Sequence, residues 1–187
     1  MNTIIKDLSL LFESPKNFAA RMMTDKKFGL GFFGYFTGTI GIFVWNSIGE
    51  GGVSAYNIIL VFILAFCLNI LLAILLSAII NFFMDVTGSQ GSATGTFIIL
   101  GVSDFMLGIL IPFAILFRAA SPGSLLGGLI IFFISVFRLI FVVYLLHVGY
   151  KCSIFKAIIA YIFPFLLGLF ITFVFIVSII TSIVTSI

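Results

Sequence analysis

Hydrophobic residues run along most of this chain in long, nearly uninterrupted stretches. Five such stretches lie near residues 28–48, 56–84, 96–117, 125–148 and 154–185. A helix of about 20 apolar residues crosses the roughly 30 Å hydrocarbon layer of a bilayer, and each stretch reaches that length. A membrane β-barrel would instead show short segments of alternating polarity. The pattern predicts an all-α integral membrane bundle of five transmembrane helices, forming a single domain over residues 28–187. Pro164 is the expected bend in the fifth helix, because proline disturbs the preceding helical turn.

Residues 1–27 have a different pattern, with hydrophobic positions that recur at helical spacing. One side of a predicted helix collects Ile4, Ile5, Leu8, Leu11 and Phe12. Ser14 and Pro15 suit the start of a second helix, on which Phe18 and Met22 share a face. This segment predicts amphipathic helices in the cytoplasmic membrane interface. Anchoring to the membrane surface and docking on the bundle both explain the pattern.

Composition and charge fit this picture. Of 187 residues, 63% are hydrophobic and 8% are charged, whereas a water-soluble domain has about 25% charged residues. With the N-terminus inside, the inner segments contain Lys6, Lys16, Arg21, Lys26, Lys27, Lys151 and Lys156, and the outer segments contain only Arg118. This bias predicts a cytoplasmic N-terminus and an extracytoplasmic C-terminus. The net charge of +3 suits anionic lipid headgroups better than nucleic acid. The candidate contacts with anionic lipids or a partner are Lys16, Arg21, Lys26, Lys27, Lys151 and Lys156.

Small residues at spacing four predict where the helices pack against each other. Transmembrane helices approach closely where small side chains leave room, and buried polar side chains need partners. Gly34 and Gly38 supply such a stripe in the first span, and Gly101 and Gly108 in the third. The second span has a row at strict spacing of four: Ala65, Asn69, Ala73, Ser77 and Asn81. We expect these rows to line helix–helix contacts.

Asp104 and Arg138 are the two charges well inside the predicted spans. Counted along the third and fourth helices, they lie roughly 12 and 16 Å from the inner face. Each alone would cost about 2.5–3.5 kcal/mol at mid-membrane. We therefore expect a salt bridge between them. A pair that fixes two helices in register and a pair at the centre of a transport path both remain open.

Other chemistry is sparse in the sequence. His147 is the single histidine, and Cys67 and Cys152 lie far apart in the predicted topology. Metal sites usually need a cluster of such side chains. The sequence predicts no catalytic site, no metal and no cofactor.

Three stretches together resemble the Yip family, five-span proteins named for their interaction with Ypt/Rab GTPases. They are "SPKNF", "GSQGSATGTFIILGVSDFMLGILIP" and "VFRLIFVVYLLHVGYKCSIFKAIIAYIFP". The family's glycine-rich inner loop is similar to the segment with Gly91, Gly95 and Gly101, and its basic turn to the one with Gly149, Ser153, Lys156 and Ala157. The resemblance implies the same five-span topology. Eukaryotic members act in vesicle trafficking through a long cytosolic N-terminal region. In this chain only residues 1–27 precede the first predicted span, so it is more similar to short prokaryotic members of the plasma membrane.

Two functions are open at this point. The first is a non-enzymatic Yip-like scaffold or adaptor that acts on membrane lipids or on a membrane or GTPase partner, with a homo-oligomer among the possible assemblies. The alternative is a small transporter or channel whose polar centre is Asp104 and Arg138.

Overall fold

The computed structural model describes residues 2–25, 27–49, 55–116 and 125–185. The described elements are helical, which confirms the predicted all-α architecture. In chain order they are α1 (Asn2–Glu13), α2 (Pro15–Thr24), α3 (Phe28–Gly49), α4 (Ala55–Val86), α5 (Ala93–Asp104), the 3₁₀ helix η1 (Phe105–Ile109), α6 (Leu110–Leu116), α7 (Leu125–Gly149) and α8 (Ile154–Thr185).

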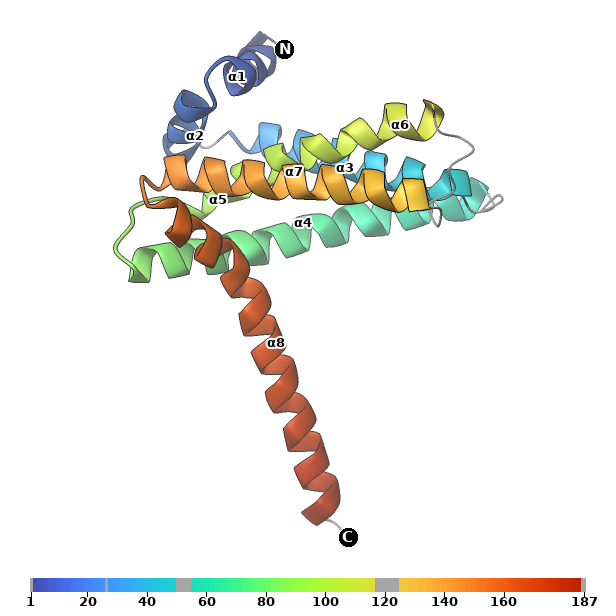
Figure 1. The fold of residues 1–187 in the computed structure, drawn as a ribbon, viewed down its shortest axis with the longest axis vertical. Coiled ribbons are helices and arrows are strands. Elements are labelled where there is room, and N and C mark those ends of the chain that lie inside the picture. Colours follow the sequence, from blue (N-terminus) through green and yellow to red (C-terminus); the bar gives the residue numbers. More distant parts are fainter. Residues whose placement is uncertain (1, 26, 50–54, 117–124, 186–187) are drawn as a thin grey trace.

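Five stretches of these helices are long and apolar enough to cross a membrane. They are Phe28–Ser47, Ile58–Val86, Ala93–Leu116, Leu125–Gly149 and Ile154–Ile179. Each overlaps one of the five predicted spans. The protein is therefore an integral membrane protein by the length and composition of its helices. We call the end of the bundle with α1 and α2 the inner end and the opposite end the outer end, after the predicted orientation (Figure 1).

The third span differs from a uniform helix because η1 interrupts it between α5 and α6. Residues three apart are eclipsed in a 3₁₀ helix. The tighter winding keeps one side of the span against α3: the backbone of Asp104 lies against Gly38 and that of Leu107 against Gly41. Leu110 then packs in a small outer cluster with Trp45.

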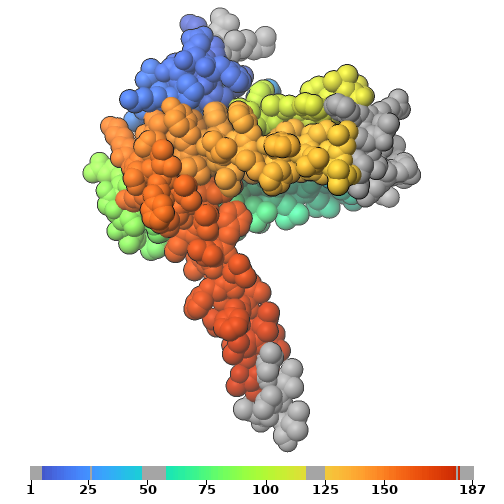
Figure 2. Space-filling model, viewed as in Figure 1, coloured from blue at the N-terminus to red at the C-terminus, as the bar shows by residue number. Residues whose placement is uncertain are grey.

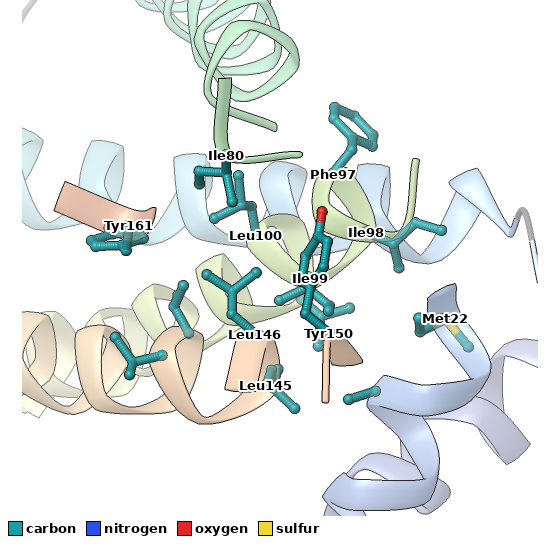
Figure 3. Close-up of a cluster of buried hydrophobic side chains, with 14 of the residues drawn as sticks. Met22, Ile80, Phe97, Ile98, Ile99, Leu100, Leu145, Leu146, Tyr150 and Tyr161 are labelled. Carbon is teal, nitrogen blue, oxygen red and sulfur yellow. The ribbon is translucent and has the colours of Figure 1, made fainter. Parts of the chain in front are cut away.

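α5 lies at the centre of the bundle, with α3, α4 and α7 packed around it. Its residues 95–104 are all buried. Figure 3 shows Ile99 and Leu100 of α5 on the side of Leu145 and Leu146 of α7, and Ile98 on the side of Met22 of α2, all within the main hydrophobic cluster. This cluster fills the inner half of the bundle.

The contact between α3 and α5 is made by glycines. A β-carbon at Gly34 would collide with the carbonyl oxygen of Gly101, and one at Gly101 would collide with Gly31. The two backbones therefore touch directly, as the predicted small-residue stripes require. Gly108 continues this contact outward, where a β-carbon would lie 2.6 Å from Thr37 Cγ2.

The N-terminal helices dock on the bundle, one of the two possibilities left open by the sequence. Phe18, Ala19 and Met22 of α2 are fully buried in the main hydrophobic cluster. Asp7 of α1 is buried and forms ion pairs with Arg21 (3.1 Å) and Lys27 (2.8 Å). These pairs tie α1 to α2 and to the start of α3.

α8 belongs to the bundle only over its first part. Ala157, Ala160, Tyr161 and Pro164 are buried. Beyond Pro164 the helix runs away from the other helices (Figures 1 and 2), and nearly every described side chain from residue 165 to 181 is exposed. The helix remains continuous through Pro164.

Candidate functional site

Asp104 and Arg138 form the predicted salt bridge. Arg138 Nη2 lies 2.5 Å and Nε 2.7 Å from the same oxygen, Asp104 Oδ1. Asn69 Nδ2 donates to Asp104 Oδ2 at 3.2 Å and to Thr39 Oγ1 at 3.3 Å. The carboxylate is 2% exposed and the arginine side chain 29%. Four helices thus meet at one polar centre, which we call the Asp104 cluster (Thr39, Asn69, Asp104 and Arg138).

The local sequence explains how these side chains come together. Gly38 leaves room for α5, because a β-carbon there would lie 2.6 Å from the carbonyl oxygen of Asp104. Asn69 belongs to the small-residue row of α4 and so faces the interior. Thr39 was missed by sequence reasoning, although a hydroxyl next to Gly38 on an interior helix was a usable signal. Its hydroxyl gives the Asn69 amide a second acceptor.

A cavity of about 500 Å³ opens beside the Asp104 cluster. Its walls come from α3, α4, Asp104 of α5, η1 and Arg138 of α7. The lining residues are Thr39, Ile42, Phe43, Asn46, Ser47, Ile58, Val61, Ala65, Asn69, Asp104, Leu107 and Arg138. The polar side chains gather at its two ends. The Asp104 cluster forms the deep end, and Asn46 and Ser47 stand at the outer end of α3, with apolar wall between.

The inner end of the bundle is closed by a second polar network. Tyr150 Oη donates to Asn81 Oδ1 at 2.8 Å and lies 2.5 Å from Thr96 Oγ1. Burial raises the pKa of Tyr150 to about 12, so the phenol stays protonated near neutral pH. Lys156 Nζ donates to Thr87 O at 2.6 Å and Ser89 Oγ at 2.7 Å. Sequence reasoning missed this network, because polar residues at the ends of spans usually face the headgroups.

The remaining predicted packing residues lie in the bundle as expected for helix contacts. Ala73 and Ser77 are buried on α4, and Ser77 Oγ donates to Ile74 O at 2.8 Å. Ala65 lines the cavity. Asn81 is a partner of Tyr150. The residues of the row on α4 therefore lie in three different places: in the cavity wall, in the core and in the inner polar network.

The predicted basic contacts divide into two groups. Three of these side chains bond within the protein: Arg21 to Asp7 and Asp25, Lys27 to Asp7, and Lys156 to the loop after α4. Lys16 and Lys151 are exposed at the inner end and remain predicted lipid or partner contacts. Lys26 lies outside the described residues.

Over the part of the chain that the structure describes, no three His, Cys, Asp or Glu side chains come close enough together to hold a metal ion. His147 Nδ1 instead contacts the carbonyl oxygen of Cys152. Compared with protein-family models, curated proteins and solved structures, the chain has no match. The resemblance to the Yip family stays a prediction.

Proposed function

We propose that the protein is a small non-enzymatic membrane transporter that binds an amphipathic solute in the cavity beside the Asp104 cluster. One observation supports this proposal above the others: the cavity of about 500 Å³ reaches a charge pair deep inside the bundle. Ligand pockets have volumes of roughly 300–1,000 Å³ and combine apolar walls with a few polar groups. A pair that only fixed helix register would need no such space beside it.

The chemistry of the cavity indicates what kind of solute fits. A guanidinium has five N–H donors, and Asp104 occupies donors on Nε and Nη2 of Arg138. The remaining donors serve a carboxylate, sulfonate or other strong hydrogen-bond acceptor. Ile42, Phe43 and Val61 hold an apolar body. The solute is an amphiphile with an acidic or accepting head.

The unequal ends of the bundle fit one state of an alternating-access cycle, in which a central site faces one side at a time. The cavity extends toward the outer end, whereas the Tyr150 network closes the inner end. Transport requires a second state, in which Tyr150 separates from Asn81 and Thr96. In the predicted orientation this second state faces the cytoplasm.

The test uses the purified full chain in liposomes and dansyl-taurine, a fluorescent sulfonate with an apolar body. Uptake should exceed that of protein-free liposomes. It should fall several-fold in Ala65→Leu, which places a larger side chain in the cavity wall. The matched control is Ala78→Leu, at an exposed position of the same helix that does not line this cavity, and its uptake should equal that of the parent protein. Uptake no higher than in empty liposomes, or equal uptake by the Ala65 variant, would overturn the proposal.

A scaffold or adaptor is the second candidate, and the exposed Lys16 and Lys151 favour it. Both stand at the inner end, where an anionic headgroup or an acidic partner would meet them. Chemical crosslinking in native membranes is the test. A stoichiometric partner that is lost in a Lys16→Glu and Lys151→Glu double variant, but retained in Ala65→Leu, would favour the adaptor over the transporter.

A further inference from the structure

The first part of α8 already sits between α4 and α7. The rings of Phe83 on α4 and Phe163 on α8 have centroids 5.0 Å apart. Ala157 and Ala160 are fully buried, and Tyr161 is 9% exposed. α8 contacts both neighbours. Up to Pro164, therefore, α8 is the wall that joins α4 to α7.

Beyond Pro164 this wall is missing at the depth where the cavity lies. α5 packs against both α4 and α7, but within the described residues α4 and α7 hardly touch each other. Ile42 lines the cavity and is still 44% exposed, and Val61 opposite is 49% exposed. Arg138 is partly exposed as well. The cavity is thus open sideways, through the groove between α4 and α7.

The part of α8 after Pro164, residues 165–185, is the outer part of the helix. Its residue spacing would align it with α4 along this groove. α4 and α8 run antiparallel, and eleven residues make about three turns, which returns a helix to the same face. Eleven residues before Phe83 is Leu72, and eleven residues after Phe163 is Val174. Both are exposed, at 55% and 46%. An α8 that continued along the groove would place Val174 on Leu72 and would then pass over the cavity wall at Ala65.

Pro164 supplies the point at which the helix can change direction. A proline inside a helix lacks the N–H that would bond the carbonyl four residues earlier, and its ring crowds the preceding turn. Sharp bends in helices occur mainly at such residues. Pro164 is buried at the edge of the bundle, where the packed and projecting parts of α8 meet.

We propose that the outer part of α8, residues 165–185, is a lateral lid that turns about Pro164 and closes the groove between α4 and α7. The described arrangement is the open position, which admits the amphiphile from the side. The closed position seals the cavity from the surrounding lipid. The lid would control access to the cavity that we propose as the solute site, so this inference rests on the proposed function.

The experiment is disulfide crosslinking in the full-length protein, with Cys67→Ser and Cys152→Ser as background. The test pair is Leu72→Cys with Val174→Cys. The control pair is Leu72→Cys with Thr172→Cys, because residue 172 lies about half a turn round α8 from the face of Phe163. Mild oxidation in liposomes should crosslink the test pair within one chain, several-fold more than the control pair.

A product of dimer size would overturn the lid within one chain and would instead place the α8 of a second copy in the groove. Equal yields from the test and control pairs, or no product from either, would also overturn it. Dansyl-taurine uptake separates the lid from the transport function. The oxidised test pair should block uptake, and reduction should restore it. If the crosslink forms but the reduced protein takes up no probe, the lid stands and the proposed function fails.

Discussion

Removing the carboxylate of Asp104 leaves the guanidinium of Arg138 without its partner inside the membrane. Breaking a buried ion pair by deleting one side costs about 3–5 kcal/mol, and an unpaired arginine at mid-membrane costs about 2.5–3.5 kcal/mol on the insertion scale. The arginine side chain is 29% exposed, which lowers the expected cost. For Asp104→Leu we therefore expect a loss of about 2–4 kcal/mol in the free energy of unfolding. This corresponds to a change of roughly 30- to 700-fold in the unfolding equilibrium.

The double variant Asp104→Leu with Arg138→Met removes both charges at once. Apolar replacements of a buried pair are often neutral or stabilising, so its free energy of unfolding should return to within about 1 kcal/mol of the parent. Asn69 donates to Thr39 in the parent protein, and this hydrogen bond should persist in the double variant. Exchanging the two charges, with arginine at position 104 and aspartate at position 138, is a poorer test. The space around the Asp104 side chain is tight, because a β-carbon at Gly38 would lie 3.0 Å from the β-carbon of Asp104. Little room is left there for arginine.

The assay is denaturant titration in detergent micelles, followed by the fluorescence of Trp45, the single tryptophan of the chain. It is buried in the outer cluster and reports on folding. The two single variants and the double variant form a cycle that isolates the interaction between the charges. Leu139→Met, at an exposed position next to Arg138, is the control for methionine. An interaction energy below about 0.5 kcal/mol, within the usual error of additivity, would refute the reasoning.

Three further predictions concern packing, the inner network and thiol reactivity. Gly34→Ala should lower the free energy of unfolding by about 1–3 kcal/mol through overpacking. The control is Gly29→Ala, because a β-carbon at Gly29 would meet open space. In the same titration it should change the free energy of unfolding by less than about 1 kcal/mol. Tyr150→Phe removes the phenol oxygen from two polar partners and should lower the free energy of unfolding by about 1–2 kcal/mol. Hydrogen exchange in the loop after α4 should become faster. Unchanged exchange there would contradict a closed inner end. Burial raises the pKa of the Cys152 thiol, so its alkylation by iodoacetamide at pH 8 should be slower than that of a free cysteine peptide and should accelerate as pH rises.

Much of the fold follows from the sequence because apolar length alone decides where a helix can cross a bilayer. The Asp104–Arg138 pair was predictable for a similar reason: two isolated charges in adjacent spans at similar depth have few other partners. Asn69 was predicted to face the interior, but its bond to the carboxylate depends on helix rotation, which composition does not specify. The network around Tyr150 joins residues 69 positions apart, and the cavity lies between side chains of five helical segments that are distant in the chain. Neither leaves a local pattern in the chain.

The 3₁₀ helix after Asp104 separates α5 from α6 within the third span. Its three residues per turn set how far α6 is rotated about the helix axis relative to α5. Deleting one residue within η1 would turn α6 by about 120° about its axis and draw it inward by about 2 Å. Leu110 and Ala114 would then leave Trp45, whereas Asp104, which precedes η1, would keep its place beside Gly38. Length changes in this one short segment would therefore rearrange the outer cluster around Trp45 without moving the charge pair at Asp104.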